Sequence, residues 1–323
     1  MPFAGTGDGR EAGDLHVIAG SGPLGLAVMR ELVARGARVR MVNRGGRAPA
    51  PAGVEVVAAD MTELAAARRA CAAASVVYNC INAPYTDWPA QLPALWNGVL
   101  EGAAAAGARL VCGDNLYMYG PAGAAAGALR ETLPNAATGR KGATRARIAT
   151  AVLDAHRAGR VRATIGRASD FYGPWVRTAA FGERVFAAAL AGKPVSVLGN
   201  PDTLHTYTYI DDFARALVTL GAEERALGDV WHVPSAPTVT TRELVAMVGE
   251  ALGRKLTLRA APAWLVGALG LVSPIMRELK ETAYQFASPF VVDHTKFERA
   301  FGAEVTPHRA AITRTLEWFK NRR

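Results

Sequence analysis

The stretch Leu15-His16-Val17-Ile18-Ala19-Gly20-Ser21-Gly22-Pro23-Leu24-Gly25 decides the fold. Its first five residues are largely apolar and predict a short strand. Apolar residues at helical spacing follow over Leu24–Arg35 and stop before Gly36, which predicts a helix. A second apolar run at Arg38–Val42 predicts the next strand. The glycine-rich turn is therefore the joint of a strand–turn–helix–strand unit.

The spacing of the three glycines in this turn suits a dinucleotide. Gly20 permits a tight turn, Gly22 lets the backbone approach a pyrophosphate, and Gly25 allows the helix to pack closely on the strand. The N–H groups and the positive dipole end of the helix then face the phosphates. A purely structural turn is the alternative, which the position of the motif between strand and helix disfavours. The predicted cofactor-binding residues of the turn are Gly20, Ser21, Gly22, Pro23, Leu24 and Gly25.

Strands and helices continue to alternate beyond this unit. Further strands are predicted at Val54–Ala58, Ser75–Ile81, Arg109–Cys112 and Val161–Gly166, with helices at Gln91–Ala106 and Gly142–Ala158. Such alternation predicts an α/β fold, a Rossmann-type doubly wound parallel sheet with helices on both faces. The less regular second half predicts a smaller C-terminal substrate-binding domain. The expected division is a flexible tail at 1–14, a nucleotide-binding domain at 15–170, and a mainly substrate-binding domain at 171–323, with some segments that return to the sheet.

Composition narrows the partners. The chain has 37 Lys and Arg against 28 Asp and Glu, a formal net charge of +9, and its basic residues are scattered. That favours a small phosphorylated ligand over nucleic acid. Cys71, Cys80 and Cys112 form neither an even set nor a metal-ligand spacing, so a reducing cytoplasm and no metal site are expected. The apolar run Trp264–Met276 is interrupted by Pro274 and too short to span a bilayer, which favours a buried or interface helix over membrane contact.

The end of the second strand bears on the choice of cofactor. NAD enzymes usually place Asp or Glu there to bind the adenosine ribose hydroxyls. Here the residues are Asn43 and Arg44, with Arg47 close behind and no acid. Arg44 can form paired hydrogen bonds with a 2′-phosphate, which favours NADP over NAD; the alternative is a solvated loop charge. Asp60 and Met61 follow the third strand and are expected to line the adenine pocket, unless Asp60 merely caps a helix.

Three later segments carry a family resemblance. Asn115-Leu116-Tyr117-Met118-Tyr119-Gly120 follows the fifth strand, Arg167-Ala168-Ser169-Asp170-Phe171-Tyr172-Gly173-Pro174 lies beyond the next strand, and Tyr209-Ile210-Asp211-Asp212 opens a helix. With the glycine-rich turn, these segments resemble the motifs of extended short-chain dehydrogenases/reductases, the NAD-dependent epimerase/dehydratase family. The resemblance runs from about His16 to the C-terminus. It is specific for the fold and weak for the reaction.

The chain departs from this family at the catalytic pair, so it resembles an atypical member. The family uses Tyr-x-x-x-Lys on the long helix, with Tyr as general acid/base and Lys on the nicotinamide ribose. A Ser or Thr after the fifth strand positions the substrate oxygen. No Tyr-x-x-x-Lys occurs in this sequence. The best register places Lys141 at the tyrosine position, Arg145 at the lysine position and Asn115 at the Ser/Thr position. The resemblance also places Asn82 and Ala83 beside the cofactor.

Three interpretations of this departure follow. In the first, Lys141 exchanges the proton, because a lysine buried beside Arg145 releases its proton more readily. In the second, Tyr117 or Tyr119 supplies a phenol from another element. In the third, the site binds cofactor and catalyses little or nothing. Arg145 remains a ribose or phosphate ligand in all three. The alternative is that Lys141 and Arg145 merely form an exposed basic start of the helix.

Further candidates surround the expected substrate site. Tyr85 and Trp88 lie in an unusually aromatic loop and either wall the substrate pocket or pack the loop onto the sheet. Asp170 and Tyr172 lie in the crossover to the smaller domain. A carboxylate there can bind a substrate hydroxyl or amine, or make a structural hydrogen bond. His205 either faces substrate or is a satisfied polar residue on a strand.

The sequence thus predicts an NADP-preferring oxidoreductase or epimerase/dehydratase-like enzyme that acts on a carbonyl or alcohol of a small organic substrate. The alternative is a catalytically weak or inactive NADP-binding sensor or scaffold protein. The resemblance implies a homodimer that pairs through the helices at Gln91–Ala106 and Gly142–Ala158. Neither nucleic acid nor a membrane is expected as a partner.

Overall fold

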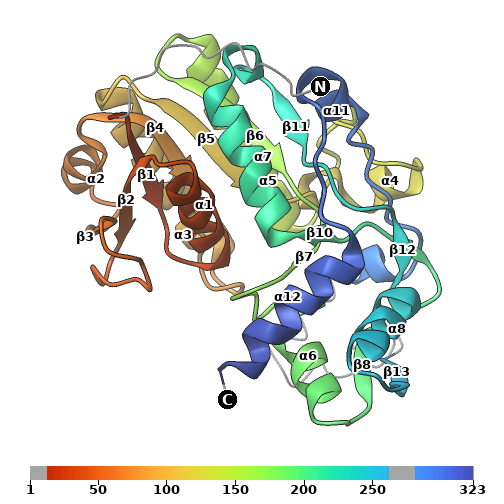
Figure 1. Cartoon of the computed structure of the whole chain (residues 1–323). Coiled ribbons are helices and arrows are strands. Elements are labelled where there is room, and N and C mark those ends of the chain that lie inside the picture. The colour runs from red at the N-terminus through yellow and green to blue at the C-terminus, as the bar shows by residue number, and fades with distance from the viewer. Residues whose placement is uncertain (1–12, 262–280, 323) are drawn as a thin grey trace, which may run out of the picture.

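The computed structural model of the chain describes residues 13–261 and 281–322. Its centre is a seven-stranded sheet in the order β11-β6-β5-β4-β1-β2-β3, and every pair of neighbours is parallel (Figure 1). The strands are β1 (Leu15–Ala19), β2 (Arg38–Asn43), β3 (Glu55–Ala58), β4 (Ala74–Asn79), β5 (Arg109–Asp114), β6 (Arg162–Arg167) and β11 (Val230–His232). The predicted doubly wound parallel sheet is confirmed.

Helices cover both faces of the sheet. On one face α1 (Pro23–Ala34) packs against α7 (Ile210–Ala222), and on the other lie α2 (Leu64–Cys71), α3 (Trp88–Ala105) and α5 (Arg140–Arg157). Alternate residues of one strand serve the two layers, since Ile18 joins the core under α1 and α7 while Val17 joins the core under α3 and α5. This double coverage explains why the strands read as nearly continuous apolar runs.

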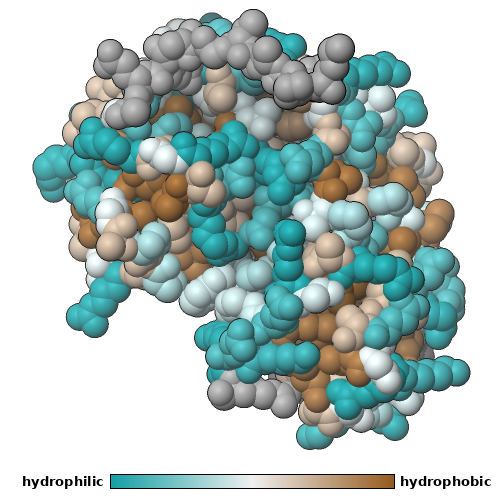
Figure 2. All heavy atoms as spheres, in the orientation of Figure 1, coloured by the Kyte–Doolittle hydropathy of each residue, from teal (hydrophilic) through white to brown (hydrophobic). Residues whose placement is uncertain are grey.

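A smaller part of the molecule is built from later segments (Figure 1). Its helices are α6 (Glu183–Leu190), α8 (Thr241–Ala251) and α12 (His308–Lys320), and its two-stranded sheets pair β7 (Phe171–Tyr172) with β10 (Thr208–Tyr209), β8 (Val195–Leu198) with β13 (Leu258–Ala261), and β9 (Leu204–His205) with β12 (Val239–Thr240). The outline of the molecule narrows between this part and the sheet layer (Figure 2). Beyond residue 170, α7 and β11 nevertheless belong to the sheet layer, and α11 (Thr295–Phe301) packs beside β11.

Residues 13–261 and 281–322 also contain short helices. They are the α-helix α4 (Gly120–Ala125) and the 3₁₀ turns Tyr117–Tyr119, Glu224–Ala226 and Ala283–Phe286. The predicted flexible tail falls mostly on residues 1–12, and the predicted helix at Trp264–Met276 falls within 262–280; both lie outside the described residues. Within residues 13–261 and 281–322, no helix is long and apolar enough to cross a membrane.

Candidate active site

The strand order reverses between β1 and β4, which are neighbours in the sheet. The chain leaves β1 into α1 on one face and leaves β4 toward α3 on the other. In open parallel sheets, ligands bind outside the carboxyl ends of the strands at such a switch point. The glycine-rich turn after β1 and the segment Cys80–Trp88 after β4 therefore meet at the edge where a cofactor is expected.

The three glycines of the turn differ in what surrounds them. Gly20 has φ +105°, and a Cβ on it would lie 2.8 Å from the carbonyl oxygen of Cys80. A Cβ on Gly25 would lie 2.0 Å from the carbonyl oxygen of Gly20. A Cβ on Gly22, at the start of α1, would meet open space. The first and third glycines are thus required by packing, while the second leaves room beside the helix N-terminus, as a bound pyrophosphate needs.

Asn43, at the end of β2, is fixed by its neighbours. Its side-chain amide donates hydrogen bonds to Ser21 Oγ (3.0 Å) and to the Arg47 carbonyl (3.0 Å), and its oxygen accepts one from the Gly45 N–H (2.9 Å). The residue that would be an acid in a typical NAD site is therefore a neutral side chain held against the glycine-rich turn. Arg44 beside it is exposed, and its guanidinium makes no hydrogen bond or ion pair within the described part of the chain.

Asp60 and Met61 follow β3 and differ in exposure. The Asp60 carboxylate is exposed and accepts hydrogen bonds from both the N–H and the hydroxyl of Thr62 (2.9 and 2.8 Å). These bonds, more than nearby Arg44, hold its pKa below the ordinary value. Asp60 is not a helix cap, because α2 starts only at Leu64. Met61 is buried under α3, where its carbonyl oxygen fills the space beside Gly98.

Arg145 lies on the buried face of α5 and joins three elements. Its Nη1 lies 3.2 Å from Asp114 Oδ1 at the end of β5, and its Nη2 donates a hydrogen bond of 3.1 Å to the side chain of Asn82 after β4. Its guanidinium lies over the Trp88 ring at 4.2 Å. Burial lowers the pKa of Arg145, and Asp114 opposes that shift. The cation is thus held at the carboxyl edge of the sheet, as the resemblance implied for the position of the family's lysine.

Lys141 lies one turn before Arg145 and has no exposed surface. Its ammonium lies 4.3 Å from the centre of the Tyr85 ring, a cation–π contact. At the same turn, Glu281 Oε1 accepts hydrogen bonds from the backbone N–H groups of Lys141 (2.8 Å) and Gly142 (3.2 Å). The alternative of an exposed basic helix start is therefore wrong for both Lys141 and Arg145, because α5 turns this face toward the sheet edge and the segment that begins at Glu281.

Two phenols complete this cluster. Tyr117 hydrogen-bonds to Tyr85, and the Tyr85 hydroxyl lies 3.1 Å from Thr282 Oγ1. Burial raises the pKa of both phenols, and the charge of Asp170 adds to the effect. Arg145 opposes the shift at Tyr117. Both hydroxyls therefore remain protonated at neutral pH and can donate hydrogen bonds.

The remaining predicted residues near this cluster have defined partners. Trp88 is buried, donates to the Ala83 carbonyl (3.1 Å) and stacks on Tyr117. These contacts fix the ring on which the Arg145 guanidinium lies. The side-chain oxygen of Asn115 accepts the Tyr117 N–H (3.0 Å) and opens the 3₁₀ turn that presents Tyr117. The structure thus brings together residues from four separate stretches of sequence.

Asp170 and His205 form a pair on the side of the smaller part. His205 Nε2 lies 3.0 Å from Asp170 Oδ2, and its Nδ1 lies 3.1 Å from the Gln285 carbonyl oxygen. Tyr172 does not join them, because it is fully buried in an aromatic core and its hydroxyl donates to His308 Nδ1 (3.0 Å). The His308 Nε2 must donate to the Pro237 carbonyl, which fixes the tautomer.

A buried network below the cluster was missed by sequence reasoning. Asp114 carries a second cation, Arg167, whose Nε lies 3.5 Å from Oδ2. Arg167 donates to the Tyr119 hydroxyl (2.9 Å), and Tyr119 lies 2.8 Å from His232 Nε2. Burial lowers the pKa of His232 to about 3, so the ring is neutral and accepts from Tyr119. Tyr119 is therefore committed to this network and does not present a phenol to the cluster.

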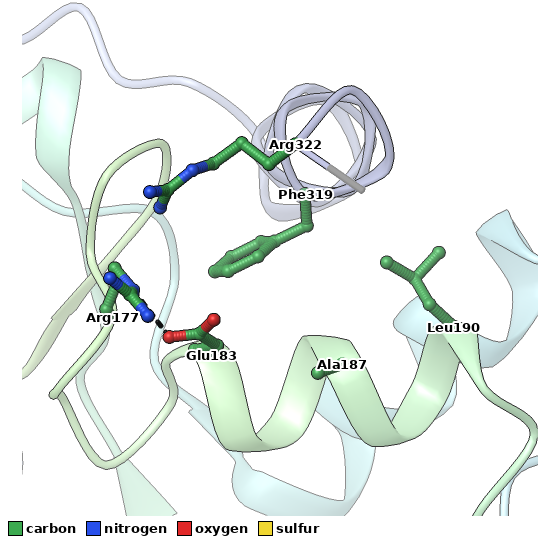
Figure 3. A pocket seen from close by; sticks show the side chains of 6 residues that line it. All are labelled: Arg177, Glu183, Ala187, Leu190, Phe319 and Arg322. Carbon is green, nitrogen blue, oxygen red and sulfur yellow. Dashed lines mark hydrogen bonds and ion pairs between the residues drawn. The ribbon is translucent and has the colours of Figure 1, made fainter.

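A separate small pocket of about 240 Å³ lies between α6 and α12 (Figure 3). Arg177 hydrogen-bonds to Glu183 at the mouth of the pocket, and Arg322 and Phe319 also line it. None of its lining residues is a predicted catalytic or cofactor-binding residue. No group of His, Cys, Asp or Glu in residues 13–261 and 281–322 is arranged to hold a metal ion.

Comparison with known sequences identifies a family that covers the glycine-rich turn, the sheet and α5. A profile of the NAD dependent epimerase/dehydratase family matches residues 16–233. The chain belongs to this family. No curated protein sequence matches it.

Solved structures agree in fold. A dTDP-glucose 4,6-dehydratase from Streptomyces venezuelae, a double mutant with NAD bound, superposes with a TM-score of 0.76 at 19% identity, over 95% of this chain and 96% of that one. The epimerase Mth375 of Methanothermobacter thermautotrophicus gives 0.78 at 16% identity, over 96% and 93%. The UDP-glucuronic acid 4-epimerase of Bacillus cereus, in complex with NAD, gives 0.74 at 16%, over 95% and 99%. At such identities the likeness establishes the fold.

Proposed function

We propose that the protein is an NADP-preferring oxidoreductase or epimerase/dehydratase-like enzyme that acts on a carbonyl or alcohol of a small organic substrate. The observation that carries this proposal is the burial of two cations, Lys141 and Arg145, one turn apart at the carboxyl edge of the sheet. Burying a cation is costly unless it is paired or used. Arg145 is paired with Asp114, and the Lys141 ammonium lies over the Tyr85 ring, so both cations have partners within the cluster.

The residues around the switch point fit a dinucleotide. The open space at Gly22 accommodates a pyrophosphate, and Asn43 offers no carboxylate to repel a 2′-phosphate. Arg44 is exposed beside it, and a guanidinium binds phosphate through paired hydrogen bonds. Asp60 and Met61 would flank the adenine, and the segment Asn82–Ala83 would border the nicotinamide half. The cofactor, when bound, accepts or supplies a hydride.

The chain's own residues then handle the proton and the substrate oxygen. Lys141 would exchange the proton on that oxygen, with the Tyr117 hydroxyl as the second donor within the same cluster. Arg145 would hold the cofactor ribose or a phosphate, because Asp114 and Asn82 fix its guanidinium. Asn115 would act by presenting Tyr117. Trp88 would keep Arg145 in place from below.

One observation favours a second candidate, a cofactor-binding sensor or scaffold. The segment from Glu281 to Gln285 bonds the Lys141 N–H, the Tyr85 hydroxyl and the His205 ring at once, so it lies against this cluster. A protein that binds the nucleotide and stays closed over these groups would turn over no substrate.

The deciding experiment is titration of the full chain with NADPH and NADH by fluorescence. Arg44→Ala is compared with Arg68→Ala, which removes the same charge from helix α2, where Arg68 pairs with Glu101. NADPH is expected to bind roughly tenfold or more tightly than NADH, and Arg44→Ala but not Arg68→Ala should abolish that difference. Failure of wild-type protein to bind either nucleotide would overturn the proposal. Nucleotide binding without turnover of any carbonyl, alcohol or sugar-nucleotide substrate would favour the scaffold.

We also propose a homodimer that pairs through α3 and α5. The residues of these helices that reach the surface include small side chains such as Ala94, Ala143 and Ala151, which permit close approach of a second helix pair. Sedimentation of the full chain tests it, and a monomer at micromolar concentration contradicts it.

A further inference from the structure

The hydrogen bonds of the Asp170–His205 pair fix how many protons the two side chains share, and this limits which ligand groups can bind beside them. The Gln285 carbonyl can only accept a hydrogen bond, so His205 Nδ1 must carry a hydrogen. The 3.0 Å contact between Nε2 and Asp170 Oδ2 then needs one more proton. Either the ring is an imidazolium that donates to a carboxylate, or the carboxylic acid donates to a neutral ring.

The two arrangements share one property. In both, Oδ2 is engaged by His205, and the other oxygen, Oδ1, can only accept. No described residue donates a hydrogen bond to Oδ1. The Asp170 side chain keeps 16% of its surface exposed, whereas that of His205 keeps 2%. Asp170 thus presents an acceptor without a donor, on a residue that still has an accessible surface.

The ring of His205 cannot turn away to change this. It stacks on Phe286 with centroids 4.8 Å apart and planes 5° apart, and Phe290 lies at 5.4 Å. The backbone of Asp170 is fixed as well, because its carbonyl accepts the Thr208 N–H at 3.0 Å. The orientation of the carboxyl group is therefore set by the fold before any ligand arrives.

The groups that feel the Asp170 charge are phenols. The carboxylate contributes to the raised pKa values of Tyr85, Tyr117 and Tyr284. These three tyrosines therefore lie near it, as does Tyr207, and Tyr85 is the one that contacts Lys141. The Thr282 hydroxyl contacts Tyr85 and the Gln285 carbonyl contacts His205, so one short segment joins the Asp170–His205 pair to the Lys141 cluster.

We propose that Asp170 Oδ1 determines specificity in the substrate site: it takes a ligand that presents a hydroxyl or protonated amine and rejects one that presents a phosphate. The inference rests on the proposed function, since it takes this cluster as the substrate site. A hydroxyl or ammonium supplies the hydrogen that Oδ1 lacks. A phosphate would place one of its oxygens, which is an acceptor, against Asp170 Oδ1, which is also an acceptor. Both oxygens would be left without a hydrogen, which costs more free energy than a missing hydrogen bond. The substrate of this chain thus presents a hydroxyl or an ammonium group to Asp170, and a sugar nucleotide that directs its phosphates to this side is excluded.

Three ligands of one carbon skeleton test the proposal: glycerol, 2-amino-1,3-propanediol and glycerol 3-phosphate. Each is titrated into the full chain, with and without NADPH, while the ring-nitrogen signals of His205 are followed by NMR. Glycerol and the amino-alcohol should shift these signals, and glycerol 3-phosphate should bind roughly tenfold or more weakly. An equal or stronger response to glycerol 3-phosphate, or no response to any of the three, overturns the proposal.

Two variants separate the hydroxyl from the amine. Asp170→Asn keeps an acceptor and a hydrogen bond to His205, so it should retain the glycerol response and lose any preference for the amine. Asp170→Ala removes the acceptor and should lose both responses, with thermal unfolding as the check on folding. Equal behaviour of wild type and Asp170→Asn toward all three ligands, together with loss in Asp170→Ala, supports the hydroxyl. NADPH binding measured on the same samples reports on the proposed function separately, because the His205 signals need no nucleotide.

Discussion

Arg145 Nη1 lies 3.2 Å from Asp114 Oδ1, and both side chains are almost wholly buried. The ion pair connects α5 to the end of β5, and Arg167 approaches the second oxygen of the same carboxylate. Two cations thus share one anion beneath the candidate site. The arrangement leaves net positive charge at the carboxyl edge of the sheet, and it gives Arg145 a structural role beside its proposed one.

Replacing Arg145 by Met should therefore destabilise the fold. Removing one partner of a buried ion pair leaves the other charge unpaired and typically lowers the free energy of unfolding by about 3–5 kcal/mol. Because Arg167 still approaches the Asp114 carboxylate, the loss should lie near the lower end of this range. Urea unfolding measures the change. Arg147→Met, at an exposed position on the same helix, is the control and should change stability by less than about 0.5 kcal/mol. Equal effects of the two variants would show that the pair contributes nothing.

Variants of Gly22 and Gly25 should affect different properties, nucleotide binding in the first case and thermal stability in the second. Gly22→Ala places its methyl group in open space, so the fold should be unaffected while nucleotide binding weakens by roughly tenfold or more. Gly25→Ala places a methyl group 2.0 Å from the Gly20 carbonyl oxygen, so it should lower thermal stability even in the absence of nucleotide. Thermal unfolding and NADPH titration of both variants check the contrast. A Gly22→Ala variant that binds NADPH as tightly as wild type would contradict the assigned cradle.

Local patterns in the sequence account for most of the sheet layer. β1 and α1 differ from their predicted ranges by at most one residue at each end, because apolar periodicity and glycine placement act over a few neighbours. The family resemblance, and not local periodicity, placed Lys141, Arg145 and Asn115 together at one edge of the sheet. What local pattern could not supply was burial, since it depends on the elements that later pack over α5.

Long-range partners explain the rest of the difference. Glu281 reaches the start of α5 from 140 residues away, and no spacing rule connects the two segments. Tyr172 was expected to face substrate from its place in a motif, yet its ring fills an aromatic core with Phe181 and Tyr209. An aromatic residue satisfies either role, and the tertiary neighbours decide between them.

Glu281 should stabilise the start of α5. The helix has Gly139 at its N-cap and no side-chain cap of its own, so the Glu281 carboxylate takes that role for two N–H groups. Glu281→Ala should cost about 1–2 kcal/mol, as loss of a cap does, while Glu281→Gln should recover much of it because the amide oxygen still accepts. Chemical denaturation of both variants measures this. Equal losses in the two would indicate that charge, rather than the hydrogen bonds, holds the contact.

Acid should destabilise the protein through His232. Burial holds the pKa of this ring at about 3, against about 6.5 in an unfolded chain. Between these values the unfolded state binds a proton that the folded state does not, so stability falls as pH drops from about 6.5 toward 3. The slope from this residue should approach about 1.4 kcal/mol per pH unit within that window.

His232→Gln isolates this contribution. Glutamine does not titrate, and its amide offers one acceptor for the Tyr119 hydroxyl and one donor for the Asp293 carbonyl, the two bonds that the ring makes. The free energy of unfolding, measured against pH from 7 to 4, should decline less steeply in the variant than in wild type. His308, whose pKa burial also lowers, contributes a slope to both proteins and cancels in the difference. Parallel curves for the two would mean that His232 binds its proton in the folded state, and that burial does not hold the ring neutral.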